Sequence, residues 1–152
     1  MLEEIVKYLI QNHISISTME SCTGGLLASL ITDIPDASTI LKFSAVPYST
    51  EYKIKMGVAK EIIDKYTVYS KEVSIEMAKV ISKFADSDLG VGITGKLTSN
   101  VDEEKSVDLC LYDRRSDKIY TTHINIIKST RMENKIEVIE AFKILFRSTF
   151  NL

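Results

Sequence analysis

The chain has 152 residues, enough for one domain with a substantial hydrophobic core. Hydrophobic residues make up 45% and charged residues 26%, and the formal net charge of −2 gives no reason to expect a nucleic acid or an anionic membrane as partner. No apolar run approaches the roughly 18–20 residues of a membrane span. The N-terminus has no signal-peptide pattern, so we expect a cytoplasmic protein.

Cysteine and histidine are too few and too scattered to predict a metal site. The chain has two cysteines, Cys22 and Cys110, and two histidines, His13 and His123, and none of them shows metal-ligand spacing. We therefore expect no bound metal, and the cysteine usage fits a reducing compartment.

The first half of the chain alternates helical and extended patterns. A first helix, ending near Asn12, is predicted from apolar residues at helical spacing: Leu2, Ile5, Val6, Leu9 and Ile10. A β-branched strand is predicted over residues 14–18, and an apolar helix follows over 26–34. A second strand is predicted over residues 40–48, where Pro47 indicates a sheet edge or a bulge.

Helices dominate the middle of the chain. Two short ones are predicted over residues 53–56, ended by Gly57, and over residues 60–65. Ser70 is expected to cap a longer helix. The predicted core face of that helix is Val73, Met77, Val80, Ile81 and Phe84.

The second half begins with a predicted buried strand over residues 89–94, followed by a polar loop over 96–104. Two strands, 107–112 and 119–126, flank residues 113–117 and predict a hairpin.

The last helix is expected to open with the capping box Thr130-x-x-Glu133. Its predicted buried residues are Met132, Ile136, Ile139, Phe142 and Phe146. Helices and strands alternate early and a hairpin comes late, so we predict an α/β fold, a three-layer α/β/α sandwich with a mixed β-sheet, as one domain over residues 1–152.

The turn between the first strand and the second helix, residues 19–25 (MESCTGG), is the best candidate for chemistry. It places hydroxyls and backbone N–H groups at a helix N-terminus, where partial positive charge collects, and this suits an anion or a nucleophile that becomes an oxyanion. An ordinary capped helix is the alternative. The turn matches neither a P-loop nor a nucleophile elbow.

Four segments together carry a family resemblance: residues 20–25 (ESCTGG), 48–53 (YSTEYK), 57–58 (GV) and 68–70 (VYS). In this order and approximate spacing they resemble the C-terminal domain of the CinA family, which includes stand-alone nicotinamide-mononucleotide amidohydrolases. The resemblance extends from about residue 10 to the final helix.

The resemblance implies a Ser/Lys amidohydrolase in which Ser21 attacks a carboxamide and Lys53 is its base. A serine hydroxyl needs a neighbouring base, and lysine can act as one only if its pKa falls from about 10.4 toward roughly 7–8. Desolvation can lower the pKa in this way. Tyr48 is expected either to orient Lys53 or Ser21 by a hydrogen bond or to be an ordinary strand tyrosine.

The predicted substrate-binding residues are Thr23, Gly24, Gly25, Thr94, Gly95, Arg131 and Lys135. Backbone N–H groups of residues 22–25 are expected to stabilise the oxyanion. Arg131 and Lys135 lie four residues apart at the start of the last helix, where they either hold a phosphate or form a solvated basic pair.

Residues 95–108 depart from the family pattern, because several family glycines and prolines are replaced. Asp108 takes one glycine position and is expected to add a negative charge near a phosphorylated substrate. The leading hypothesis is hydrolysis of nicotinamide mononucleotide, a small-molecule nucleotide, to nicotinate mononucleotide and ammonia, without metal or organic cofactor. The main alternative is a weak or inactive CinA-like binding protein with a diverged substrate loop.

A third hypothesis makes Cys22 the nucleophile, with His13 or His123 as base. A cysteine at such a junction is more often buried packing. We also expect a homo-oligomer.

Overall fold

The computed structural model of the chain describes residues 2–98 and 104–152. Its strands are β1 (Ile16–Glu20), β2 (Leu41–Ala45), β3 (Leu89–Gly95), β4 (Ser106–Asp113) and β5 (Lys118–Asn125). Its helices are α1 (Glu3–Gln11), α2 (Leu26–Thr32), α3 (Thr50–Lys55), α4 (Lys60–Tyr66), α5 (Lys71–Ala85) and α6 (Arg131–Phe150), with a 3₁₀ turn η1 (Ala37–Thr39). None of these helices is long and apolar enough to cross a bilayer.

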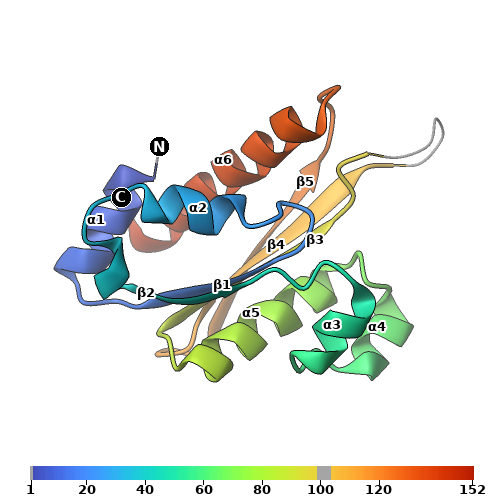
Figure 1. Cartoon of the computed structure of the whole chain (residues 1–152), viewed down its shortest axis with the longest axis horizontal. Helices are drawn as coiled ribbons and strands as arrows, with labels where there is room; N and C mark the ends of the chain where they lie inside the picture. The colour runs from blue at the N-terminus through green and yellow to red at the C-terminus, as the bar shows by residue number, and fades with distance from the viewer. Residues whose placement is uncertain (1, 99–103) are drawn as a thin grey trace.

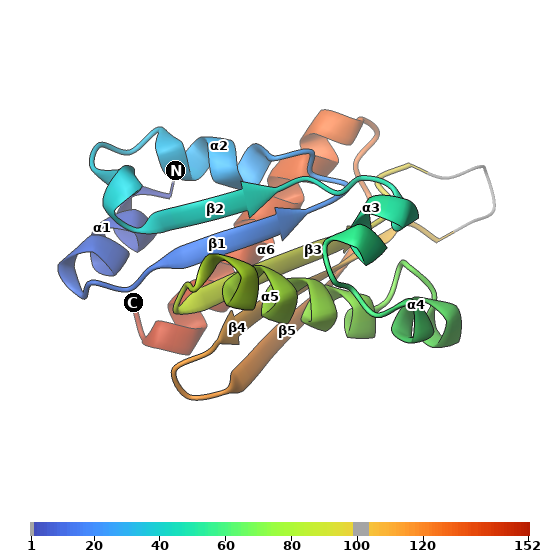
Figure 2. The ribbon, with the colours of Figure 1, turned by 60° about the horizontal axis from the view of Figure 1, so that its bottom comes forward.

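The strands form one mixed sheet in the order β2-β1-β3-β4-β5. Strands β2, β1 and β3 run parallel, whereas β4 is antiparallel to β3 and β5 is antiparallel to β4. Helices α1, α2 and α6 cover one face of the sheet, and α3, α4 and α5 lie on the other (Figures 1 and 2). The predicted three-layer α/β/α sandwich with a mixed sheet is confirmed.

Each face of the sheet has its own apolar core. The larger cluster includes Leu9, Leu27 and Phe142 from the helices of one layer. The smaller one joins Met19 of β1 to Met77 of α5 on the opposite face. Burial of apolar surface on both faces is the main term that holds the three layers together.

Helix α5 lies directly on β3 because β3 carries glycines where the two elements meet. A Cβ atom at Gly90 would be 2.0 Å from the Ala78 carbonyl oxygen, and one at Gly92 would be 2.1 Å from that of Ser74. Small residues on α5 and glycines on β3 therefore set the spacing between helix and sheet.

Several element boundaries differ from the sequence prediction, and β2 ends at Ala45, three residues before the predicted end at residue 48. β1 begins two residues later than expected because the backbone N–H of Ile14 donates to Leu9 and continues the end of α1. The strand ends at Glu20. Helix α3 begins earlier than expected because the Ser49 side chain accepts a hydrogen bond from the N–H of Tyr52 and acts as its N-cap.

The predicted core faces of α5 and α6 were wrong at three positions. Met132 is 58% exposed and Ile136 is 49% exposed, because the polar Asn134 occupies the inward face of α6 at that level. The Asn134 side chain is satisfied there by the backbone of Leu97 and Lys128. Phe84, expected in the core, is exposed near the end of α5.

The caps and the hairpin agree with the sequence prediction. Ser70 caps α5, and Thr130 caps α6 by accepting a hydrogen bond from the N–H of Glu133. β2 is an edge strand, and Pro47 lies just beyond it. The predicted loop over residues 96–104 is described only at residues 96–98 and 104.

The parallel strands determine where a site can form. The carboxyl ends of β1, β2 and β3 lie at the same edge of the sheet, and the connections that leave β1 and β2 pass over opposite faces. In open α/β sheets a crevice forms at such a switch point.

Candidate active site

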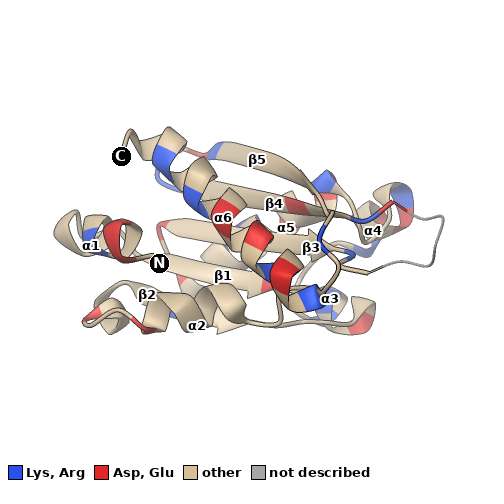
Figure 3. Cartoon of the chain, turned by 90° about the horizontal axis from the view of Figure 1, so that it is seen from above, with Lys and Arg blue, Asp and Glu red and all other residues tan. Residues whose placement is uncertain are grey.

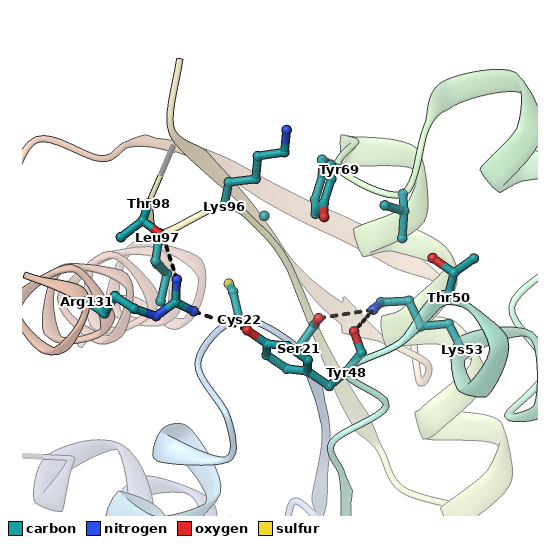
Figure 4. Close-up of a pocket in the computed structure, with 12 residues that line it drawn as sticks. Ser21, Cys22, Tyr48, Thr50, Lys53, Tyr69, Lys96, Leu97, Thr98 and Arg131 are labelled. Carbon is teal, nitrogen blue, oxygen red and sulfur yellow. Dashed lines mark hydrogen bonds between the residues drawn. The ribbon is translucent and has the colours of Figure 1, made fainter. Parts of the chain in front are cut away.

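A cavity of about 390 Å³ opens at this edge of the sheet (Figure 4). Its walls come from the segments that follow the three parallel strands, the approach to α5 and the first residue of α6. The described residues that line it are Ser21, Cys22, Tyr48, Thr50, Lys53, Val68, Tyr69, Gly95, Lys96, Leu97, Thr98 and Arg131. Three of these side chains are basic and none is acidic.

Ser21 and Lys53 meet in the wall of this cavity. Ser21 is the first residue after β1, and Lys53 lies on α3. The Lys53 Nζ donates a hydrogen bond of 3.0 Å to the Ser21 Oγ. Ser21 is 7% exposed and Lys53 is 2% exposed. The predicted proximity of the two side chains is confirmed, while their catalytic roles stay a prediction.

The Lys53 amine is held entirely by neutral groups. Besides Ser21, its Nζ donates to the backbone carbonyl oxygens of Pro47 at 2.9 Å and Tyr48 at 3.3 Å. No carboxylate is among its hydrogen-bond partners in the described part of the chain. Burial lowers the pKa of Lys53 from its ordinary value, because the low-dielectric surroundings disfavour the ammonium form.

Glu20 occupies the N-terminus of α2, where the sequence suggested either an anion or a nucleophile that becomes an oxyanion. Its carboxylate accepts hydrogen bonds from the backbone N–H groups of Leu27 and Ala28, both at 3.0 Å, and from the Thr23 hydroxyl at 2.7 Å. The helix terminus is therefore already neutralised by the protein's own charge. Of the two uses that the sequence suggested for this turn, the contacts of Glu20 disfavour a separate anion at the α2 terminus, and a nucleophile that becomes an oxyanion stays a prediction.

The turn that follows Glu20 is closed by its own backbone. The N–H of Gly24 donates to the Ser21 carbonyl oxygen, and that of Leu26 donates to Thr23. Gly24 and Gly25 have positive φ angles of 64° and 93°, which glycine adopts without strain. A Cβ at Gly24 would lie 3.3 Å from the Lys135 Nζ, so this amine lies against the turn.

The structure separates the two basic residues of α6. Arg131 lines the cavity, where its guanidinium donates to the Thr98 hydroxyl at 2.8 Å and to the Tyr48 hydroxyl at 3.1 Å. Lys135, one turn later, lies against Gly24 and does not line the cavity. Their predicted joint role in binding phosphate remains untested.

Tyr48 contacts Lys53 differently from the expectation. Its backbone carbonyl oxygen accepts from the Lys53 Nζ, whereas its hydroxyl is bonded to Arg131 and not to Ser21 or Lys53. Figure 4 shows the Tyr48 ring beneath the cavity with its hydroxyl directed toward Arg131.

Of the remaining predicted substrate-binding residues, Gly95 lines the cavity. Thr94 does not, and it is only 1% exposed, with its hydroxyl donating to the Val68 carbonyl oxygen. Thr23 is also 1% exposed, and its hydroxyl is used by Glu20. Both threonines therefore stabilise the walls of the site from behind.

Asp108 does not lie where the sequence analysis expected it. Its carboxylate is 2.8 Å from the His123 Nδ1 on the neighbouring strand, and Asp108 is not among the residues that line the cavity. In the antiparallel register Asp108 stands between Thr94 and His123, so these three side chains share one face of the sheet.

The cysteine hypothesis finds no support in this geometry. Burial raises the pKa of the Cys22 thiol to about 12, so the thiol stays protonated near neutral pH. His13 lies before the start of β1, at the opposite end of that strand from Cys22, and His123 is paired with Asp108.

Four polar side chains of the cavity were not among the predicted site residues, although two of them lie within the motifs of the family resemblance: Thr50, Tyr69, Lys96 and Thr98. The Lys96 Nζ lies 4.8 Å from the centre of the Tyr69 ring, a cation–π contact across the cavity wall. Positions 96 and 98 follow β3 at the switch point, and that place in the fold was the available signal.

Charged positions of both signs are mixed along α6, as Figure 3 shows.

Within residues 2–98 and 104–152, no cluster of three or more His, Cys, Asp or Glu side chains is arranged to hold a metal ion.

Comparison with known proteins identifies the family. The family model of the CinA C-terminal domain matches residues 1–148. The chain belongs to the CinA C-terminal domain family. A CinA-like protein of Fervidobacterium nodosum is 35% identical over 150 residues, which are 97% of this chain and 37% of that protein. A relative from Clostridium botulinum (strain Kyoto / Type A2) is 44% identical over 97 residues, which are 62% of this chain and 24% of the relative. The CinA-type chain thus spans well under half the length of these relatives.

Solved structures show the same fold. A CinA superfamily protein from Klebsiella pneumoniae superposes with a TM-score of 0.87 at 21% identity, over 97% of this chain and 94% of the other. The competence/damage inducible protein CihA from Agrobacterium tumefaciens gives a TM-score of 0.85 at 22% identity, over 99% and 94% of the two chains.

Proposed function

We propose that this CinA-family chain is a Ser/Lys amidohydrolase that converts nicotinamide mononucleotide to nicotinate mononucleotide and ammonia. The observation that carries the proposal is the buried contact of 3.0 Å between the Lys53 Nζ and the Ser21 Oγ inside a cavity. A nucleophile and a base within hydrogen-bond distance are what covalent amide hydrolysis requires.

The surroundings of Lys53 suit a neutral amine as well as an ammonium ion. A neutral lysine has two N–H donors and one lone pair. The carbonyl oxygens of Pro47 and Tyr48 can take the two N–H groups, which leaves the lone pair for the hydroxyl proton of Ser21. Because burial also lowers the pKa of Lys53, the base form is accessible nearer to neutral pH than in an exposed lysine.

The reaction follows from these two groups. The Ser21 Oγ attacks the carboxamide carbon and gives its proton to Lys53. The carbonyl oxygen of the substrate thereby becomes the oxyanion of a tetrahedral intermediate. The C–N bond then breaks as Lys53 returns the proton to the leaving nitrogen, and ammonia departs from an acyl-serine. Water attacks this ester, Lys53 takes one of its protons and returns it to Ser21, and the acid is released as its carboxylate.

The backbone of the turn is the best source of oxyanion stabilisation. The N–H groups of Gly24 and Leu26 donate within the turn, and those of Leu27 and Ala28 donate to Glu20. Of the other residues in the turn between Ser21 and α2, Cys22 is the one among the described residues that lines the cavity, so its N–H is the candidate donor. One such donor typically contributes about 10²–10³-fold to the rate.

Arg131 is the group best placed to bind the phosphate of the substrate. It lines the same cavity as the reacting pair and stands at the N-terminus of the long helix α6. Guanidinium groups bind phosphate oxygens through charge-assisted hydrogen bonds. The cationic lining, without an acidic side chain among the described residues, favours an anionic substrate.

A second candidate is a binding protein of the same family with little or no turnover. Thr98 stands at a position where the resemblance expects glycine, and its hydroxyl accepts a hydrogen bond from Arg131. This contact competes with a ligand for the guanidinium, and it favours altered specificity.

One assay separates the two candidates. Purified protein is incubated with nicotinamide mononucleotide, and both ammonia and nicotinate mononucleotide are measured, with Ser21→Ala as the matched control. Equal release of both products by the unaltered chain, and none by Ser21→Ala, is the expected result. If the protein binds nicotinamide mononucleotide saturably but releases neither product, the amidohydrolase proposal is rejected in favour of the binding protein.

A further inference from the structure

We infer that Glu20 is a positioning residue for Ser21, which it holds in reach of Lys53 by tying the nucleophile turn to the start of α2. The inference rests on the proposed function of the Ser21–Lys53 pair and adds a residue that acts on it indirectly. Glu20 does not line the cavity, so it has no direct contact with a substrate there.

Glu20 is a fully buried carboxylate, and its hydrogen bonds connect the end of β1 to the turn and to the start of α2. Its side chain is 0% exposed. One oxygen accepts from the Thr23 hydroxyl and the Leu27 N–H, and the other accepts from the Ala28 N–H. A carboxylate is costly to bury, and three donors at a helix N-terminus offset that cost.

Helix α2 depends on this distant cap because its own N-cap cannot supply one. The N-cap is Gly25, which has no side chain to accept a hydrogen bond. Glu20, five residues before Gly25 at the end of β1, instead accepts the hydrogen bonds of the first N–H groups of the helix. Its carboxylate thus spans the whole turn from β1 to α2, with Ser21 as the first residue inside the span.

The same contacts fix Ser21 from both sides. Ser21 follows Glu20 directly, and its carbonyl oxygen accepts from the Gly24 N–H, so the turn is closed against the anchored Thr23. Without the carboxylate, the N–H groups of Leu27 and Ala28 would lose their acceptor in a buried place, and the turn would shift to satisfy them. Ser21 would then move relative to Lys53, which is held independently by α3 and the Pro47 carbonyl.

The expected consequence is a loss of reactivity at Ser21 without a change in the titration of Lys53. A misplacement of about 1 Å can lower a rate by about 10²-fold. Burial lowers the pKa of Lys53, and the hydrogen-bond partners of its amine in the described part of the chain are Ser21 and the carbonyl oxygens of Pro47 and Tyr48 rather than Glu20. The midpoint of the pH–rate profile should therefore stay the same when Glu20 is replaced.

The test measures Ser21 itself, with a fluorophosphonate probe and intact-mass spectrometry. In this reaction the Ser21 Oγ forms a P–O bond, the P–F bond breaks, fluoride leaves and the hydroxyl proton passes to Lys53. The variants are Glu20→Gln and the milder Thr23→Val, which removes only the hydroxyl that contacts Glu20. Ser21→Ala is the blank, and all rates are taken where circular dichroism shows folded protein.

The matched control is Asp88→Asn. Asp88 makes a comparable contact at the other end of β1, where its carboxylate accepts from the N–H and the hydroxyl of Ser15 at 2.8 and 3.0 Å. We expect labelling to slow by about 10²-fold in Glu20→Gln and by about 10-fold in Thr23→Val, with an unchanged pH midpoint. Asp88→Asn should stay within about 2-fold of the unaltered chain, even with a lower Tm.

Each outcome has one meaning. Equal labelling of the unaltered chain and both Glu20-site variants overturns the positioning role and leaves the Ser/Lys hypothesis standing. A shifted pH midpoint in Glu20→Gln also overturns it, because Glu20 would then act on Lys53. If Glu20→Gln does not fold, Thr23→Val decides alone. Absence of labelling in the unaltered chain overturns both the proposed function and this inference.

Discussion

The Lys53 Nζ lies 3.0 Å from the Ser21 Oγ, although the two residues are 32 positions apart in the sequence. Ser21 follows β1, the second strand from the edge of the sheet, and Lys53 lies one helical turn into α3, beyond the edge strand β2. Parallel pairing of β1 and β2 brings the two segments to one edge of the sheet. The contact is thus a direct product of the topology.

Replacing Lys53 by Met should abolish amide hydrolysis while the fold is kept. Methionine has a similar length, but it cannot accept the Ser21 proton, so we expect a loss of at least about 10³-fold in kcat. Lys55→Met, on the same helix but exposed and paired with Glu51, is the control and should retain activity. Full activity in Lys53→Met would remove lysine from the mechanism.

Unfolding measured against pH should reveal the buried amine of Lys53. Its folded-state pKa lies below the unfolded value of about 10.4, so between these two values the unfolded chain binds more protons. In this window the contribution of Lys53 makes the free energy of unfolding rise with pH. We therefore expect Lys53→Met to be more stable than the unaltered chain at neutral pH. This advantage should shrink toward pH 10, as measured by urea titration.

The contact between Ser21 and Lys53 was predictable from sequence because the two motifs that carry the family resemblance contain both residues. The role proposed for Glu20 was not, because a glutamate at the end of a strand gives no sign that it accepts hydrogen bonds from the N–H groups of a helix seven and eight residues later. The contacts of Arg131 and Lys135 were predictable only in part. A spacing of four places both on one side of α6, but their different depths along the helix bring one to the cavity and the other to Gly24.

The fold was predicted better than the fine placement of apolar side chains. Alternating helices and strands indicated the layers, whereas Met132 and Ile136 have the right spacing for a core face and are nonetheless exposed. The reason is Asn134, whose buried amide bonds to two backbone segments and turns the opposite side of α6 outward. The hydrogen bonds that a buried polar side chain makes to distant backbone can therefore decide which face of a helix is buried, against the face that the spacing of apolar residues predicts.

Ser17, away from the candidate active site, tests how much free energy of unfolding is lost when a hydroxyl is buried without a hydrogen-bond partner. It is 0% exposed on β1, and its hydroxyl has no hydrogen-bond partner among the described residues. Ser17→Ala should leave the free energy of unfolding unchanged or raise it by up to about 1 kcal/mol. Ser82, equally buried, donates to the Ser87 carbonyl oxygen, so Ser82→Ala should lower it by about 1 kcal/mol. Equal losses in the two variants would contradict the assignment.

Of the charges near the cavity, we expect Arg131 to control the binding of a phosphorylated substrate. Arg131 lines the cavity and can offer further N–H groups beyond those used by Thr98 and Tyr48. Arg131→Ala should therefore raise KM by about 10-fold or more with a smaller change in kcat, and the effect should weaken as salt is raised.

Asp108→Asn should leave KM nearly unchanged, because its carboxylate faces His123 outside the cavity. Lys128→Ala, which removes a cation near the start of α6 that is paired with Glu137, is the control for general loss of positive charge. A larger change in KM for Asp108→Asn than for Arg131→Ala would place the phosphate beside β4 and β5 instead.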